Sequence, residues 1–234
     1  MTRIDCTPRH CDMMIKVCGN CIPENIAAVA SLTPMLMGFI FYEPSPRNAC
    51  SLDPNIIADL PNFIRPVAVF VDKPIDEMLD IVERYGFKIV QLHGSESPDT
   101  CTKLKQLGLT VFKAFGLDDD TDLNQIKPYE GTADLFVFDT ASDARGGSGK
   151  KFDWHKLDGY ELSTPYLLSG GIGPDDIDSI IAAMRPRMAG IDINSRFETS
   201  PGVKNITSLT HFILSLRNHN ENEPSTTPFW EKTK

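Results

Sequence analysis

DLFVFDTASDARGGSGKKFDW, residues 134–154, is the stretch that indicates most about the fold of this chain. An apolar run, 135–138, ends at the carboxylate of Asp139, and a polar, glycine-rich loop follows it. Residues 152–154 then predict the start of a helix. Barrels of alternating strands and helices place catalytic groups where a buried strand meets its loop. A single Asp at a strand end more often caps a turn, so the interpretation depends on whether the pattern recurs.

The pattern of strand, polar tip and helix recurs along the chain. Several of the apolar runs are continuous rather than alternating, which is typical of parallel strands buried on both faces. The predicted strands are residues 14–17, 36–41, 67–71, 88–92, 110–115, 135–138, 166–168 and 189–193.

Helical patterns lie between several of these strands, at 26–32, 75–86, 100–108 and 177–184. Each of these patterns follows a proline, and each has acidic residues near its start. Both features favour a first helical turn. Gly86 and Gly108 are suitable C-terminal stops. A repeat of roughly 25 residues therefore predicts an α/β fold, a single (β/α)8 TIM barrel. A doubly wound sheet is the alternative, but this chain lacks the Gly-x-Gly-x-x-Gly that usually follows its first strand.

The whole chain fits one domain. Residues 1–217 are predicted to form the barrel with a short N-terminal extension, and the polar segment 218–234 is predicted to be a C-terminal tail. The net charge of -9 and the pI near 5.0 argue against nucleic acid or an anionic membrane as a partner. No apolar run approaches the roughly 20 residues that a membrane-spanning helix needs, and no signal peptide is recognisable, so we expect a cytoplasmic protein.

The 6 cysteines are few for 234 residues and do not suggest a disulfide scaffold. Cys18 and Cys21 form a C-x-x-C, which raises the alternative of a thiol-redox or metal-binding module. A zinc site needs a second ligand pair, and the sequence offers neither another C-x-x-C nor an H-x3-5-H. We therefore expect no metal site.

In a barrel, the residues that follow the strands share one rim. These residues include a thiol, an imidazole, a carboxylate, two arginines and small residues next to predicted helix starts. They are Cys18, Arg47, His93, Asp139, Ser169, Gly170, Gly171, Asn194, Ser195 and Arg196.

Two glycine-containing loops on this rim, 146–149 and 169–171, allow backbone N–H groups to approach an oxyanion. Each loop alone would more often be a tight turn, but together they favour a phosphate site. Gly149-Lys150 is not a nucleotide P-loop, because Lys151 stands where Ser or Thr is required.

Several motifs now resemble one family, the phosphoribosylanthranilate isomerases. They occur in the order typical of that family and span about residues 14–217. The motifs are KVCGN (16–20), GFIFYEPSPRN (38–48), VQLHG (90–94), FDT with GGSGKKFDW (138–140 and 146–154), LLSGGI (167–172) and DINSRFETSPGVKN (192–205).

The resemblance implies a cofactor-free, metal-free isomerase of tryptophan biosynthesis, an intramolecular oxidoreductase of the aldose–ketose type. Its reaction is the Amadori rearrangement of N-(5'-phosphoribosyl)anthranilate to 1-(2-carboxyphenylamino)-1-deoxyribulose 5-phosphate. The resemblance makes Cys18 the general base and Asp139 the general acid, and it places Arg47 near the anthranilate carboxylate. The predicted substrate-binding residues are Arg47, His93, Gly147, Gly149, Gly170, Gly171, Asn194, Ser195 and Arg196.

This chemistry requires one acid and one base. The acid opens the ribose by protonating its ring oxygen, and the base then removes the proton on C2'. Cys18 must reach the thiolate form, so we expect Lys16 and the backbone N–H groups of Gly19 and Asn20 to favour the anion. Without the resemblance, Cys18 would be interpreted as an inert core thiol.

The chain departs from the family pattern at Arg196, because the family usually has Ser-Ser-Gly-Val-Glu where residues 194–198 read NSRFE. Arg196 either replaces the lost backbone contact with a charged one or points to solvent. Cys21 stands where the family often has Thr. His93 either binds substrate or holds a strand end, and Asp192 either braces its neighbours or contacts substrate.

Two other functions remain as alternatives. One is a related sugar-phosphate barrel such as indole-glycerol-phosphate synthase, although the catalytic lysine and glutamate pattern of that longer enzyme is absent. The other is the redox or metal module built on the C-x-x-C. A monomer and a homodimer are both compatible with the sequence.

Overall fold

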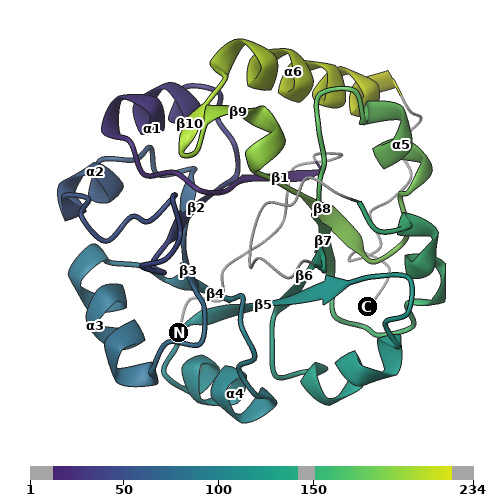
Figure 1. The fold of residues 1–234 in the computed structure, drawn as a ribbon, viewed down its shortest axis with the longest axis horizontal. Helices are drawn as coiled ribbons and strands as arrows, with labels where there is room; N and C mark the ends of the chain where they lie inside the picture. The colour runs from purple at the N-terminus through teal and green to yellow at the C-terminus, as the bar shows by residue number, and fades with distance from the viewer. Residues whose placement is uncertain (1–12, 142–150, 223–234) are drawn as a thin grey trace.

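The eight apolar segments form a closed barrel of parallel strands in the computed structural model, which describes residues 13–141 and 151–222. Each strand pairs with the next along the chain, and β8 closes the ring by pairing with β1. Figure 1 shows the strands as an inner ring with the helices outside it. The strands are β1 (Met14–Val17), β2 (Leu36–Ile40), β3 (Arg65–Phe70), β4 (Ile89–Leu92), β5 (Thr110–Leu117), β6 (Leu135–Thr140), β7 (Tyr166–Leu168) and β8 (Met188–Ile193).

The predicted fold class is therefore confirmed, and every predicted strand overlaps an observed one. The largest difference at a strand start is in β3, which begins at Arg65 and includes Pro66. Pro66 has no N–H to donate, which is why the prediction began after it. In the barrel it still holds a ladder position, opposite Met37 of β2.

The helices are α1 (Pro23–Ala30), α2 (Pro54–Ala58), α3 (Ile75–Tyr85), α4 (Pro98–Gln106), α5 (Ile177–Ala182) and α6 (Ile206–Asn222). The four helical patterns correspond to α1, α3, α4 and α5. Gly86 ends α3 in the left-handed conformation, with φ of 73°, as a C-terminal stop should. The short α2 was not predicted; its start is stabilised by Asp53, whose side chain accepts a hydrogen bond from Asn55 N.

After β5 and β6 the chain forms 3-10 helices instead of α-helices, η1 (Leu123–Tyr129) and η2 (Trp154–Gly159). The helix expected from residues 152–154 is thus a 3-10 helix of 6 residues, capped by Asp153. Pro128 lies inside η1 and has no N–H for a continuing α-helical ladder. At the other end of the chain, α6 continues to Asn222, past the predicted start of the tail.

Two layers of apolar side chains hold the barrel together. One layer fills the ring, with residues such as Val67, Phe112 and Val137, and the other packs the outer faces of the strands against the helices. Buried Lys16, Gln91, Lys113 and Asp192 add polar groups to this interior. Within the described ranges, no helix is long and apolar enough to cross a membrane.

Gly38 of β2 leaves room for the side chains of Lys16 in β1 and of Cys18, which follows β1. A Cβ at this position would lie 2.7 Å from Cys18 Sγ and 3.1 Å from Lys16 Nζ. Carbon and sulfur atoms cannot approach to 2.7 Å without a shift of one of them. The glycine in this strand is therefore a packing requirement of the residues beside it.

We predict that Gly38→Ala lowers the free energy of unfolding by about 1–3 kcal/mol, the usual cost of overpacking a dense interior. Denaturant unfolding of the purified variant measures this change. Gly159→Ala is the matched control, because nothing lies within 4 Å of a Cβ there. If Gly38→Ala is as stable as Gly159→Ala, the packing argument is wrong.

Candidate active site

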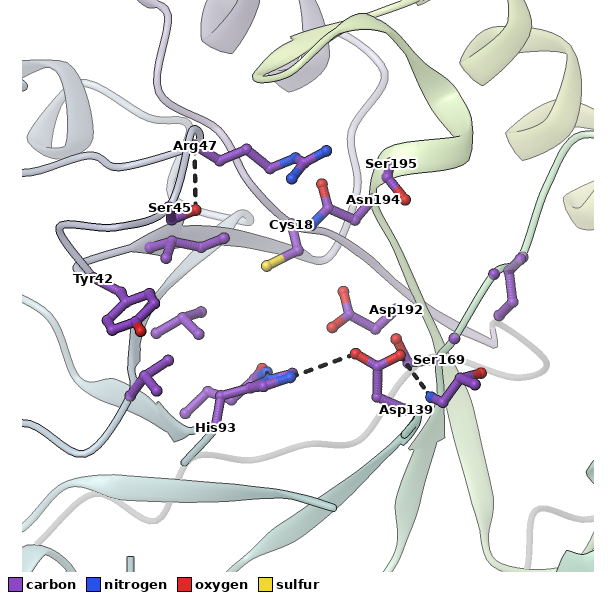
Figure 2. Close-up of a pocket in the computed structure, with 18 of the residues that line it drawn as sticks. Cys18, Tyr42, Ser45, Arg47, His93, Asp139, Ser169, Asp192, Asn194 and Ser195 are labelled. Atoms are coloured by element: carbon purple, nitrogen blue, oxygen red, sulfur yellow. Dashed lines mark hydrogen bonds and ion pairs between the residues drawn. The ribbon is translucent and has the colours of Figure 1, made fainter. Parts of the chain in front are cut away.

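One pocket at the carboxyl ends of the strands brings the described candidate residues together. It is lined by all ten rim residues of the sequence analysis, Cys18, Arg47, His93, Asp139, Ser169, Gly170, Gly171, Asn194, Ser195 and Arg196. Gly147 and Gly149 lie outside the described residues. In Figure 2, Tyr42, Ser45 and Arg47 lie on one side of the pocket and Asp139 and Ser169 on the other, with Cys18 and Asp192 between them.

Cys18 follows β1 and is 6% exposed. Its backbone N–H donates to Ile193 O of β8 at 2.9 Å, which fixes the residue at the rim. Burial raises the pKa of the Cys18 thiol; Lys16 and Lys204 oppose this effect, but they do not reverse it. The expectation that this neighbourhood favours the thiolate is therefore wrong for the free protein.

The expected help from the Asn20 backbone is also absent. The Asn20 N–H donates to Gly38 O at 3.1 Å and is not available to the thiolate. The Asn20 side chain is buried too, and its Nδ2 donates to Val17 O at 2.7 Å. Asn20 thus holds the first loop against β2, which is a structural role.

Lys16 is held next to Cys18 by an ion pair with Asp192, whose Oδ2 lies 2.8 Å from Lys16 Nζ. Burial alone would lower the pKa of Lys16, but Asp192 and Cys18 more than offset it, and the pKa is raised. Burial raises the pKa of Asp192, against the effect of Lys16. Asp192 Oδ1 has no hydrogen-bond partner among the described residues, and Asp192 lines the pocket. The residue thus braces Lys16 and keeps one oxygen for another group.

Asp139 and His93 form a second polar pair, across the pocket from Arg47 (Figure 2). Asp139 Oδ1 accepts a hydrogen bond from Thr140 N at 2.8 Å, and Oδ2 lies 3.4 Å from His93 Nε2. Gln91 Nε2 lies 2.9 Å from the other ring nitrogen of His93, Nδ1. With Gln91 donating to Nδ1, the hydrogen of the neutral ring is on Nε2 and faces Asp139. His93 therefore orients the carboxylate.

The loop after β7 forms the small-residue side of the pocket. Gly170 has φ of 84°, and a Cβ there would lie 2.5 Å from Thr140 N and 3.1 Å from Asp139 Oδ1. Only glycine fits this combination of conformation and space. The loop is fixed further along by Asp176, which accepts from Gly173 N at 2.6 Å and forms an ion pair with Lys151.

Arg196, the departure from the family pattern, is exposed but lies along the same loop. Its Nε is 3.5 Å from the position that a Cβ on Gly173 would occupy. The side chain lines the pocket and is not directed away from it. The exposed guanidinium of Arg196 thus lies next to the β7 loop.

Two charged residues that hold pocket-lining side chains were not among the predicted ones. They are Glu198, which binds Arg47, and Lys204, which binds Asn194. They lie in a small hairpin after β8, β9 (Glu198–Ser200) and β10 (Val203–Lys204). Glu198 Oε2 lies 2.7 Å from Arg47 Nη2, and Lys204 Nζ lies 2.6 Å from Glu198 Oε1. Burial raises the pKa of Glu198, but the two cations outweigh burial and lower it. Both residues belong to the quoted motif 192–205, but spacing alone did not indicate that they meet Arg47.

The C-x-x-C residues do not stand in a metal-binding cluster. Cys18 and Cys21 are free cysteines, and the second is only partly buried. Within residues 13–141 and 151–222, no group of three or more His, Cys, Asp or Glu side chains could hold a metal ion.

We predict that alkylation of Cys18 by iodoacetamide still accelerates with pH at about pH 9, because only the thiolate reacts and burial raises the pKa of this thiol. Peptide mapping by mass spectrometry measures the rate at Cys18 alone. A synthetic peptide of residues 16–20 is the control and should level off earlier. A rate that is already constant below pH 7 would show that the free protein holds the thiolate.

The chain is similar to known proteins that share one family name. Residues 15–214 match the family model described as N-(5'phosphoribosyl)anthranilate (PRA) isomerase. A relative from Parabacteroides distasonis, named N-(5'-phosphoribosyl)anthranilate isomerase, is 43% identical over 206 residues, which cover 87% of this chain and 93% of the relative. A relative of the same name from Phocaeicola vulgatus is 41% identical, with 88% and 98% covered.

Solved structures of phosphoribosyl anthranilate isomerases have a similar fold. The phosphoribosyl anthranilate isomerase of Thermotoga maritima aligns with a TM-score of 0.78 at 28% identity, covering 89% of this chain and all of that one, 100%. Another phosphoribosyl anthranilate isomerase was solved in complex with reduced 1-(o-carboxyphenylamino)-1-deoxyribulose 5-phosphate, and it aligns with a TM-score of 0.76 at 27% identity, covering 88% of this chain and 100% of that one. From the family match and the relatives above 40% identity, the chain belongs to the N-(5'-phosphoribosyl)anthranilate isomerase family.

Proposed function

We propose that this protein converts N-(5'-phosphoribosyl)anthranilate to 1-(2-carboxyphenylamino)-1-deoxyribulose 5-phosphate, a step of tryptophan biosynthesis, with Cys18 as general base and Asp139 as general acid. One observation carries the assignment of roles. A thiol and a carboxylate line the same pocket, between a guanidinium on one side and a glycine loop on the other. Such a pocket matches a substrate that is anionic at both ends and reacts in the middle.

The two anionic ends of the substrate determine its orientation. The aromatic carboxylate lies at Arg47, and the phosphate lies at the loop of Ser169, Gly170 and Gly171 together with Ser195 and Arg196. Backbone N–H groups in a glycine loop and a charged fork are both effective phosphate donors. This orientation leaves the ribose between Cys18 and Asp139, within reach of both.

Asp139 protonates the ring oxygen of the ribose, the ring opens, and a Schiff base forms between C1' and the anthranilate nitrogen. Cys18 then removes the proton on C2' and gives an enolamine, which tautomerises to the ketose. Lys16 lies next to Cys18 and stabilises the thiolate that this step needs. His93 keeps the Asp139 carboxyl group directed into the pocket through the 3.4 Å contact.

The proposed scheme changes the protonation state of both catalytic groups. One turnover moves a proton from Asp139 to the ring oxygen and another from C2' to Cys18, so the enzyme ends with a thiol and an ionised carboxyl group. A proton must then pass from the thiol to the carboxyl group before the next turnover. The raised pKa of Cys18 favours the thiol with which one turnover ends and opposes the thiolate with which the next begins, whereas Lys16 favours that thiolate.

The direct test is to mix the protein with freshly prepared N-(5'-phosphoribosyl)anthranilate and to follow the loss of its fluorescence. We predict that Cys18→Ala and Asp139→Asn each lower kcat by at least ~10²-fold with little change in substrate binding, because general acid–base groups act on the transition state. Cys21→Ser is the control and should keep its activity. Inactivity of the parent protein would refute the function; full activity of both variants would refute only the assigned roles.

A separate prediction concerns Arg196. If it shares the phosphate, Arg196→Ala should raise KM by about 10-fold, the lower end for a charge-assisted contact, because the side chain is exposed. The effect should diminish at high salt for the same reason. Arg185→Ala is the matched control, since Arg185 binds Asp158 and does not line this pocket. An unchanged KM would leave the phosphate to the glycine loop and Ser195.

A further inference from the structure

Arg47 does not enter the pocket as a free side chain. Its Nε lies 3.0 Å from both carboxylate oxygens of Glu198, and its Nη2 lies 2.7 Å from Oε2. The side chains of the two residues are only 12% and 4% exposed. Glu198 thus occupies one edge of the guanidinium with a bidentate, charge-assisted contact.

Arg47 lines the pocket, and Glu198 leaves one edge of its guanidinium unoccupied. A guanidinium carries five N–H donors in a fixed plane, and Glu198 uses the edge formed by Nε and Nη2. The other edge is formed by Nη1 and the outer hydrogen of Nη2. Among the described residues, no acceptor binds this edge, because all side-chain hydrogen bonds of Arg47 go to Glu198. A second carboxylate can therefore bind there in the same plane.

Glu198 is itself held in place by a buried lysine. Lys204 Nζ lies 2.6 Å from Glu198 Oε1 and 2.7 Å from Asn194 Oδ1, and the Lys204 side chain is fully buried at 0% exposure. The Lys204 backbone is fixed by Asn25 of α1, with hydrogen bonds of 2.8 and 3.0 Å. These contacts connect the hairpin, α1 and the β2 loop that carries Arg47.

The formal charges of Arg47, Lys204 and Glu198 leave one positive charge for an anionic group of the substrate. Arg47 and Lys204 are cations and Glu198 is an anion, which leaves a net charge of about +1 for the carboxylate of the substrate. Without Glu198, the buried Lys204 would lose its counter-ion, and burial already lowers its pKa. Loss of Glu198 would therefore lower the pKa of Lys204 further and would also remove the contact that holds Arg47.

We propose that Glu198 is a positioning residue that fixes Arg47 with its outer Nη edge toward the aromatic carboxylate of the substrate. The inference rests on the proposed function, which places that carboxylate at Arg47. It adds that the hairpin after β8, and not only the arginine, determines the preference for an aryl carboxylate. Ordering a long side chain in advance reduces the entropy cost of binding.

The test compares two substrates, prepared fresh from ribose 5-phosphate with either anthranilate or aniline, so that they differ only in the carboxylate. The discrimination is the ratio of their kcat/KM values. We expect Glu198→Ala to lower kcat/KM for the anthranilate compound by about 10-fold, mainly through KM, and to change the aniline compound less than about 2-fold. Arg47→Ala should abolish the discrimination, and adding Glu198→Ala to it should have no further effect on the ratio.

Glu77→Ala is the matched control, because Glu77 pairs with Lys73 at the surface. If Glu198→Ala fails to fold, Glu198→Gln keeps the length of the side chain and should lose part of the discrimination. An unchanged ratio of the two kcat/KM values would overturn the inference. If both values fall equally, Glu198 has a merely structural role, and if neither falls, it does not position Arg47. A ratio that survives Arg47→Ala would overturn the placement of the carboxylate as well, whereas inactivity of the parent toward both compounds would refute the proposed function itself.

Discussion

Closure of the parallel barrel is the constraint on which the site depends. Because every strand runs in the same direction and β8 pairs with β1, all eight carboxyl ends lie on one rim. Cys18 after β1 and Asn194 after β8 are far apart in the chain, yet the closure brings them to one pocket. Opening the ring between β1 and β8 would separate Lys16 from Asp192, and with it the cation next to the thiol.

The sequence predicted the fold through a physical pattern that the structure follows closely. Strands buried on both faces must be apolar throughout, so runs such as 135–138 mark them without other information. Helices on the outer surface are less constrained, which is why α2 was missed and η2 was expected to be an ordinary helix. Short elements depend on single caps, here Asp53 and Asp153, and a cap does not determine how long the helix continues.

The sequence predicted the site residues that lie at strand ends, such as Cys18 and Asp139. It did not predict the residues whose position depends on contacts between loops. Glu198 meets Arg47 across 151 residues of sequence, and no spacing rule indicates this pair. The state of Cys18 was misjudged for a related reason. Lysine near a thiol suggests a thiolate, but burial of the thiol acts in the opposite direction and has the larger effect on its pKa.

The measurement that tests the central claim most directly is a crystal structure of this protein with reduced 1-(2-carboxyphenylamino)-1-deoxyribulose 5-phosphate. The account predicts the carboxylate at the outer edge of Arg47, the phosphate at Gly170, Gly171 and Ser195, and C2' between Cys18 and Asp139. A phosphate bound at Arg47, or a C2' beyond the reach of the Cys18 thiol, would contradict it.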